Sequence, residues 1–330
     1  MISIKVLQGV LAAAAMIGMA SASTARSEEI DISNYGVAMN GMPFAVVMDK
    51  GYFKECGLDI TGIISSPGGG TTIRNHLAGN LLYSEPSLAA VVAAVQSGAE
   101  IKIVSGNAHT VSDISWVTMP DSPIDSLADI KGKRLGFTNP GSTTQALTLL
   151  LLEKAGLTTA DVEMVATGGF GPGLTALETG GVDVMALTEP LSSRDADKYK
   201  TVIRAKDVFP PMNNVIGVAT TEAIENRPED ITCVITARRK AVEFMYDNPD
   251  EAATIIAAAY KMDEAVIARA VKNLIDGSVD GIPYWGPGRL HYEGMDNMIR
   301  AQRMVGAVEG EVDWSQLVDE SLLPEDLRSR

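Results

Sequence analysis

The chain has 330 residues, with 27 Lys and Arg against 42 Asp and Glu, and a formal net charge of −15. This length permits two domains of about 150 residues each, and 46% hydrophobic with 21% charged residues is the composition of a folded globular protein. The acidic balance argues against a nucleic-acid partner, for which a basic face is expected.

The amino terminus has the pattern of a secretory signal peptide. Lys5 precedes an apolar run, residues 6–20, which is shorter than a typical membrane span. Small residues follow, and cleavage after Ala22 or Ala25 fits; we take residues 1–25 as the signal. No cysteine lies at the cleavage point to carry a lipid anchor. We therefore predict an exported, soluble, periplasmic product.

Strands and helices alternate along the first part of the chain. The predicted elements, in order, are strand 30–37, helix 44–52, strand 58–64, helix 71–77, helix 88–96, strand 101–105 and strand 114–119. Strands that alternate with crossover helices imply a mainly parallel sheet.

A second series of the same kind follows. A capped helix near 124–130 leads to a strand that ends at Phe137, and the next elements are helix 145–155, strands 162–166, 182–187 and 215–220, and helices 231–246 and 249–260. This order predicts a chain that builds lobe one, then lobe two, and then returns to lobe one.

One phrase occurs twice. Residues 63–72 (IISSPGGGTT) lead through a short helix to 78–86 (AGNLLYSEP), and residues 165–173 (VATGGFGPG) lead in the same way to 179–190 (TGGVDVMALTEP). Each copy reads as strand, glycine-rich turn, helix, strand and Glu-Pro. The two copies predict two similar α/β lobes, although their unequal spacing leaves chance similarity open.

Three segments resemble the nitrate, sulfonate and taurine class of ABC-transporter solute-binding proteins, which includes relatives of the thiamin-pyrimidine synthesis proteins. They are residues 50–60 (KGYFKECGLDI), 127–137 (LADIKGKRLGF) and 180–190 (GGVDVMALTEP). The family shows Gly, a polar residue and then Asp where this chain has Gly79-Asn80-Leu81. The resemblance thus leaves room for an unusual ligand facing lobe one.

The resemblance implies an α/β, two-lobe periplasmic binding protein fold of type II-like architecture, each lobe a mainly parallel sheet flanked by helices. We expect lobe one to be discontinuous, at 26–116 and 217–330, and lobe two to span 117–216, with crossings at 116–117 and 215–216. Such a protein closes over a small organic ligand and presents it to an ABC-transporter membrane permease, and we expect it to be a monomer.

The glycine turns supply the first ligand candidates. Gly70 and Thr71 precede one predicted helix, the residues Asn139, Gly141, Ser142 and Thr143 precede a second, and Gly169 and Phe170 a third. Unpaired backbone N–H groups at a helix start favour an anion or a carbonyl oxygen. In the alternative interpretation, Thr71 and Ser142 only cap their helices.

Two carboxylates stand at predicted strand ends, Glu85 after Ser84 and Glu189 after Thr188. Each could accept hydrogen bonds from a ligand amine or heterocycle. Alternatively, each anchors a helix start or pairs with a Lys or Arg, because a buried charge without a partner is costly.

Other side chains complete the candidate set. Phe170 is expected to cover the cleft. Trp285 is expected in an irregular C-terminal loop, where it either leans over the ligand or seals a helix junction, whereas Trp116 is assigned to the core. Asn40 and Met42 follow the first strand, a position from which family members commonly reach their ligand. The full candidate set is Asn40, Met42, Gly70, Thr71, Ser84, Glu85, Asn139, Gly141, Ser142, Thr143, Gly169, Phe170, Thr188, Glu189 and Trp285.

Nothing in the sequence predicts catalysis or a metal. Three scattered histidines lack zinc-ligand spacing, no cofactor motif is found, and no nucleophile–base pair stands out. We treat Cys56 and Cys233 as separate buried thiols, although an exported protein could pair them. We therefore predict a binding protein, not an enzyme; the alternatives are a pyrimidine-synthesis-like enzyme on the same fold, whose branch relies on a cysteine-rich motif, or a ligand-sensing receptor subunit.

The turns also limit the ligand. No arginine lies within a turn motif, so we expect the turns to bind a bare multiply charged anion such as sulfate poorly. We expect a planar organic molecule with donor and acceptor groups, such as an aromatic acid or a pyrimidine-like heterocycle. The alternative, taken from the resemblance, is an alkyl sulfonate.

Overall fold

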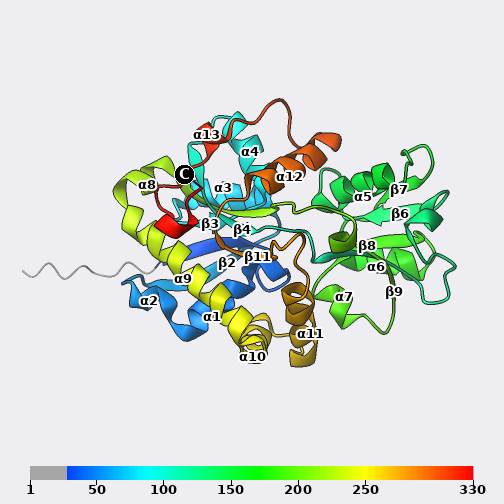
Figure 1. Cartoon of the computed structure of the whole chain (residues 1–330), viewed down its shortest axis with the longest axis horizontal. Helices are drawn as coiled ribbons and strands as arrows, with labels where there is room; N and C mark the ends of the chain where they lie inside the picture. Colours follow the sequence, from blue (N-terminus) through cyan, green and yellow to red (C-terminus); the bar gives the residue numbers. More distant parts are fainter. Residues whose placement is uncertain (1–27, 330) are drawn as a thin grey trace, which may run out of the picture.

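Two β-sheets organise the chain into two lobes, as the computed structural model of residues 28–329 shows (Figure 1). Sheet A, in lobe one, takes strands from both ends of the described chain, and sheet B, in lobe two, takes its strands from the middle. The predicted signal peptide, residues 1–25, lies outside the described residues. None of the helices in residues 28–329 is long and apolar enough to span a membrane.

Sheet A has six strands in the order β11-β4-β10-β3-β1-β2. Its strands are β1 (Glu28–Ser33), β2 (Ile60–Ser66), β3 (Ser84–Glu85), β4 (Ile101–Ala108), β10 (Val215–Thr220) and β11 (Trp285–Gly288). Strand β1 pairs in parallel with β2 and β3, whereas β10 runs antiparallel to its neighbours β3 and β4.

Sheet B has five strands in the order β7-β6-β8-β5-β9. Its strands are β5 (Ile114–Thr118), β6 (Arg134–Phe137), β7 (Glu163–Ala166), β8 (Val184–Thr188) and β9 (Lys200–Arg204). Strand β6 pairs in parallel with β7 and β8, and β5 runs antiparallel between β8 and β9.

The two sheets share one topology. In sheet A the strands lie in the order β2, β1, β3, β10 and β4, and in sheet B the strands β7, β6, β8, β5 and β9 take the same places. The fourth place, β10 or β5, is antiparallel to its neighbours, and sheet A has β11 as an additional edge strand. The two copies of the repeated phrase occupy equivalent places, β2–α3–β3 in lobe one and β7–α6–β8 in lobe two. The predicted repeat is therefore a real structural repeat, and the predicted two-lobe α/β fold is confirmed.

Helices cover both faces of sheet A. The helices of lobe one are α1 (Met42–Lys50), α2 (Tyr52–Glu55), α3 (Gly69–Gly79), α4 (Leu88–Gln96), α8 (Thr221–Asn226), α9 (Pro228–Asp247), α10 (Pro249–Tyr260), α11 (Glu264–Ile275), α12 (Tyr292–Met304) and α13 (Trp314–Leu317), with the 3-10 turns η1 (Met39–Gly41) and η4 (Glu325–Leu327). Helices α1, α9 and α10 share one apolar core with β1, and α4 and α12 share another with β4. This second core continues into lobe two, where it includes Trp116 and α5.

Lobe two has fewer helices than lobe one within the described chain. They are α5 (Thr143–Lys154), α6 (Phe170–Glu178) and α7 (Leu191–Arg194), with the 3-10 turns η2 (Leu127–Ile130) and η3 (Ala205–Asp207). Helix α6 packs on β8 through a small separate cluster that includes Leu174, Leu177 and Met185.

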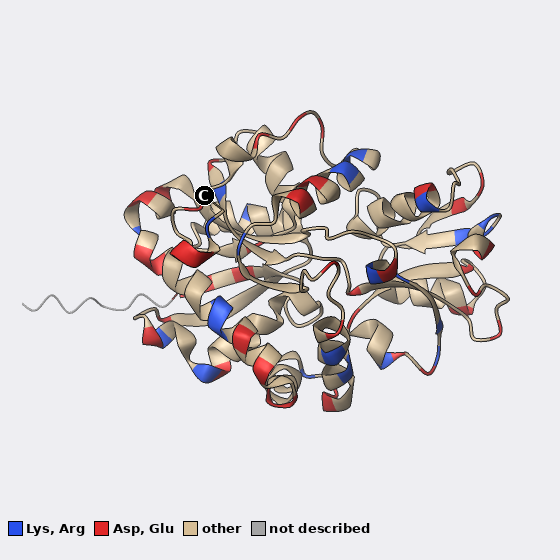
Figure 2. Ribbon diagram, viewed as in Figure 1, with Lys and Arg blue, Asp and Glu red and all other residues tan. Residues whose placement is uncertain are grey.

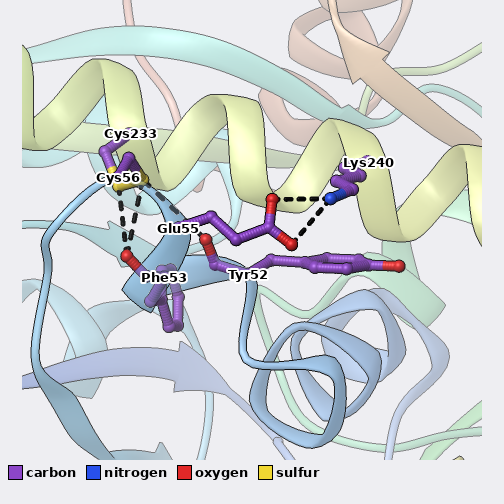
Figure 3. Close-up of a disulfide and its surroundings, with 6 residues drawn as sticks. All are labelled: Tyr52, Phe53, Glu55, Cys56, Cys233 and Lys240. Carbon is purple, nitrogen blue, oxygen red and sulfur yellow. Dashed lines mark hydrogen bonds and ion pairs between the residues drawn. A yellow bond between two sulfur atoms is a disulfide. The ribbon is translucent and has the colours of Figure 1, made fainter.

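Cys56 and Cys233 form a disulfide, which corrects the expectation of two separate thiols. Their Cα atoms lie 5.9 Å apart, although 177 positions separate the residues in the sequence. The bond joins the end of α2 to α9 (Figure 3). Beside it, Lys240 of α9 pairs with Glu55 at 2.6 Å and lies 4.2 Å from the centre of the Tyr52 ring.

Two further expectations need revision. Trp285 lies in β11 at the edge of sheet A and is fully buried, not in an irregular loop. The crossings between the sheets lie at residues 109–113 and 205–214, because Trp116 is already inside β5 and Val215 opens β10.

Candidate ligand-binding site

The carboxyl edges of the two sheets face each other. The first crossing leads from the end of β4 to the start of β5, where Ile114 pairs with Thr188 at the end of β8. The second leads from the end of β9 to the start of β10, where Val215 pairs with Ala108 at the end of β4. Both crossings therefore join carboxyl edges, the place where α/β sheets bind ligands.

In lobe one, two helix starts meet at this edge. Helix α3 follows Gly68, whose φ of 101° suits glycine, and no side chain caps it. Helix α4 follows Ser87 and also lacks a side-chain cap. A Cβ atom on Gly69 would lie 2.8 Å from the Ser87 backbone nitrogen, so the two starts are in contact. The Leu88 N–H at the start of α4 donates to the Asn214 carbonyl at 2.9 Å, so the donors suited to an anion at this edge are the Gly69 and Gly70 N–H groups at the start of α3.

In lobe two, helix α6 repeats this arrangement. It follows Gly169, whose φ is 152°, and no side chain caps it. Phe170, its first residue, is half-buried and packs against the small α6–β8 cluster, so the ring has core contacts that the sequence did not reveal. Each lobe thus has one uncapped glycine helix start at the carboxyl edge of its sheet, after β2 in lobe one and after β7 in lobe two.

Helix α5 differs from these because its start is capped. The Ser142 hydroxyl accepts a hydrogen bond from the Gln145 backbone nitrogen at 3.2 Å, and the Gly141 N–H donates to Gln145 Oε1 at 2.8 Å. Thr143 Oγ1 donates to Asn214 Oδ1, in the second crossing, at 3.3 Å. The capping interpretation therefore holds for Ser142, while Asn139 stays exposed on the turn.

Arg74 is a candidate that the sequence reading missed. It lies on α3, and its Nη2 donates to Thr71 Oγ1 at 2.7 Å, which brings the guanidinium back to the first turn of the helix. A Cβ atom on Gly70 would lie 3.7 Å from Arg74 Nη1. The i, i+3 spacing from Thr71 is the signal that could have identified it.

Glu85 is enclosed in lobe one. Its side chain is 0% exposed, and its Oε1 lies 2.7 Å from Arg238 Nε and accepts a hydrogen bond from Asn107 Nδ2 at 2.5 Å. Burial raises the pKa of Glu85 to about 7, and the Arg238 charge opposes this shift. The structure thus favours the internal-partner interpretation, and we leave Glu85 out of the site proposed below.

Four other candidates are buried within lobe one. Met42 and Trp285 are 0% exposed, and the Trp285 indole N–H donates to the Met39 carbonyl at 2.9 Å. Ser84 Oγ lies 2.9 Å from His76 Nδ1. Asn40 Nδ2 donates to the Ser33 carbonyl at 3.2 Å. These contacts account for all four within the fold.

Thr188 and Glu189 are tied to neighbouring segments. Thr188 Oγ1 donates to Asp113 Oδ2 at 2.9 Å, and burial raises the pKa of Asp113 to about 6. Glu189 accepts from the Ser193 backbone nitrogen at 3.0 Å, at α7, and from Asn273 Nδ2 of lobe one at 2.8 Å. Glu189 therefore anchors a helix start and links the lobes.

Comparison with known proteins gives a family and a fold. The family model described as "NMT1/THI5 like" matches residues 38–252. A Bacillus subtilis (strain 168) protein described as an aliphatic sulfonates-binding protein is 22% identical over 246 residues, 72% of each chain.

Solved structures of similar fold include both a binding protein and an enzyme. The periplasmic aliphatic sulphonate binding protein SsuA of Escherichia coli aligns with a TM-score of 0.74 at 16% identity, covering 88% of this chain and 91% of its own. The desulfurization enzyme DszB aligns with a TM-score of 0.64 at 14% identity, covering 90% and 97%. At these identities the likeness concerns the fold alone.

Proposed function

The chain belongs to the NMT1/THI5-like family, and on this basis we propose that it is an exported solute-binding protein that captures a small organic anion between its lobes. In this proposal a monomer collects the ligand in the periplasm and delivers it to an ABC-transporter permease. The description of the Bacillus subtilis relative supports capture rather than turnover.

One observation carries the proposal: uncapped glycine helix starts occur on both lobes, at Gly68 and Gly169. The free N–H groups of each start, together with the helix dipole, favour a negatively charged group. Arg74 adds a full positive charge beside the first of them. An anionic head group held between these starts would draw the lobes together.

We propose a sulfonate or a carboxylate on a small organic body as the ligand. The Bacillus relative is described as binding aliphatic sulfonates, and Arg74 supplies the cation that the turn sequences lack. A heterocycle would need a carboxylate as hydrogen-bond acceptor. Such a ligand is less well supported, because the Glu85 carboxylate is already paired with Arg238. The half-buried ring of Phe170 offers apolar surface to the organic body.

Titration calorimetry with ethanesulfonate and benzoate tests this function. We expect saturable binding of at least one of them, and Arg74→Gln should weaken it by about 1.5–3 kcal/mol, the range for a hydrogen bond to a charged group. Arg303→Gln, which removes an exposed arginine of α12, is the matched control and should leave the affinity unchanged.

Two results would contradict the proposal. One is the absence of heat with either anion. The other is equal affinity in Arg74→Gln and Arg303→Gln. Chemical conversion of the bound ligand during incubation would favour an enzyme instead.

A further inference from the structure

The lobes contact each other on two flanks of the crossings. On one flank α12 of lobe one packs against α5 of lobe two, and on the other α11 of lobe one lies beside α7 of lobe two (Figure 1). The two flanks are held together by different kinds of contact. This difference determines which flank opens more readily when the lobes move relative to each other.

The α5–α12 flank is held by buried apolar side chains. Leu147 of α5 and Met298 and Ile299 of α12 belong to the one core that continues from lobe one into lobe two. At the exposed rim of this flank, Arg300 pairs with Glu153 at 2.5 Å, and a cavity of about 230 Å³ lies between the helices. Separation of α5 from α12 would return the apolar side chains to water, which is unfavourable.

Helix α11 is amphipathic, and its apolar face belongs to lobe one. The buried side chains of this face join the core formed with α1, α9 and α10, and they are Ile267, Ala270, Val271 and Leu274. Arg269 and Asn273 lie one turn apart on the exposed side of the helix. Figure 2 shows basic and acidic positions along α11. Helix α11 therefore moves with lobe one and presents polar groups to lobe two.

These polar groups bind the segment that begins α7. Arg269 Nη1 donates to the Ser193 carbonyl at 3.2 Å. Asn273 Nδ2 donates to Glu189 Oε1 at 2.8 Å and to Ser193 Oγ at 3.2 Å. Three hydrogen bonds from two exposed side chains thus connect the lobes on this flank.

The apolar core does not extend across the α7–α11 flank within residues 28–329. Helix α11 belongs to the core of lobe one, whereas Leu191 of α7 packs against the small α6–β8 cluster. A cavity of about 550 Å³ lies between α11, α7 and the strands β5 and β9, and Arg269 and Asn273 are part of its lining. Because both side chains are exposed, water can replace their hydrogen bonds when the helices part, so each bond contributes little net free energy.

We propose that α11 is a releasable polar lock between the lobes. While Arg269 and Asn273 bind the α7 segment, lobe two is held in the arrangement described above. When these bonds open, lobe two rotates about the α5–α12 flank, which stays packed. The lock requires no ligand, so its test is independent of the proposed function.

Spin labels on the two lobes test the lock in the free, oxidised protein. The labels are attached at Asp197→Cys of lobe two and Asp247→Cys of lobe one, both exposed positions, and pulsed electron paramagnetic resonance measures the distances between them. Arg269→Ala/Asn273→Ala removes all three hydrogen bonds. We expect a second distance population, whose ratio to the first rises roughly tenfold over the protein with an intact lock. Arg300→Gln, which removes the exposed ion pair of the other flank, is the matched control and should leave the distances unchanged.

A change of charge at the same position gives a second readout. Arg269→Ala/Asn273→Asp places a carboxylate beside Glu189, so the second population should be larger than with alanine. The excess should shrink at high salt, because salt screens the repulsion. A general loss of packing would not produce this salt dependence.

The Tm separates release of the lock from unfolding. It should change little in the double variants, since Arg269 and Asn273 are exposed and the apolar face of α11 is intact. If a double variant does not fold, Asn273→Ala alone, which removes two of the three bonds, carries the test. Distances that are unchanged in the lock variants, or that change equally in Arg300→Gln, overturn the proposal.

Discussion

At the residue scale, Glu85 and Arg238 form the central polar contact of lobe one. Arg238 is 1% exposed, and its guanidinium also donates to the Gly286 carbonyl at 2.7 Å and the Asn107 carbonyl at 3.0 Å. The pair therefore joins α9 to β3, β4 and β11. Two charges removed from water are tolerated only when such partners surround them. Loss of one charge leaves the other buried without its partner, and the desolvation free energy of that charge is then not compensated.

Glu85→Gln should therefore destabilise the fold rather than remove a ligand contact. The buried Arg238 would lose its counter-charge, and we expect a loss of about 3 kcal/mol in the free energy of unfolding, measured by urea denaturation. Glu55→Gln is the control, since the exposed Glu55–Lys240 pair should contribute no more than about 1 kcal/mol.

Ligand affinity distinguishes the two interpretations of Glu85. If Glu85→Gln were as stable as Glu55→Gln but bound the anion more weakly, Glu85 would be a ligand contact after all. An unchanged affinity in a less stable protein supports the internal pair.

At the element scale, the glycine start of α3 depends on its close backbone approach to α4. Gly69 sits where α3 meets α4, and any side chain there would meet the Ser87 backbone and Ala90 Cβ within 3.0 Å. Backbone cannot move aside as a flexible side chain can. The donor surface of lobe one therefore requires glycine at this position.

Gly69→Ala should lower both the Tm and the affinity for the anion, because α3 and α4 must separate to admit the methyl group. Gly70→Ala is the matched control: the nearest atom to its new Cβ is the flexible Arg74 Nη1 at 3.7 Å, so the Tm should be unchanged. Thermal unfolding and calorimetry measure both effects. Equal Tm values in the two variants would show that the helix starts are not in rigid contact.

Much of the element pattern could be predicted from the sequence, because alternating apolar strands and glycine stops are local signals. The helix at 88–96 and the helix at 249–260 match α4 and α10 in both bounds. Strand β11 could not be predicted, since its WGPG sequence carries no strand pattern and joins sheet A only through tertiary pairing with β4.

The site was less predictable than the fold. The glycine turns carry a local signal: α6 starts directly after Gly169, at the predicted turn, whereas α3 starts at Gly69, two residues before the predicted helix. Glu85 is bound by Asn107 and Arg238, and Glu189 is bound by Asn273. Each of these partners is distant in the sequence from the carboxylate that it binds. No spacing rule reveals such contacts, and the same holds for the pairing of Cys56 with Cys233.

At the scale of the whole molecule, the disulfide closes a very long loop. It joins residues 177 positions apart, so it restricts the unfolded chain strongly. The loop-entropy relation gives about 5 kcal/mol for a loop of this length. The bond also fixes α9, which carries Arg238, against the α1–α2 segment.

Cys56→Ser/Cys233→Ser should therefore lower the free energy of unfolding by about 5 kcal/mol. Urea denaturation of the variant and of the oxidised protein measures the difference. The oxidised protein treated with a reductant should approach the variant, and the variant itself should not respond to the reductant. A reductant effect of equal size in the variant would mean that the disulfide is not the cause.

The strands of sheet B lie in the sequence between the early and the late strands of sheet A, and this placement determines which sheet is synthesised completely first. All five strands of sheet B have been synthesised by residue 204, whereas sheet A lacks β10 until residue 220 and β11 until residue 288. A chain that emerges with its amino terminus first thus presents a complete lobe two while lobe one is still without an inner strand. Cys233, too, arrives only after that strand. The lobe that begins the chain is the last to be finished, and every premature stop before residue 215 leaves it open along the middle of its sheet.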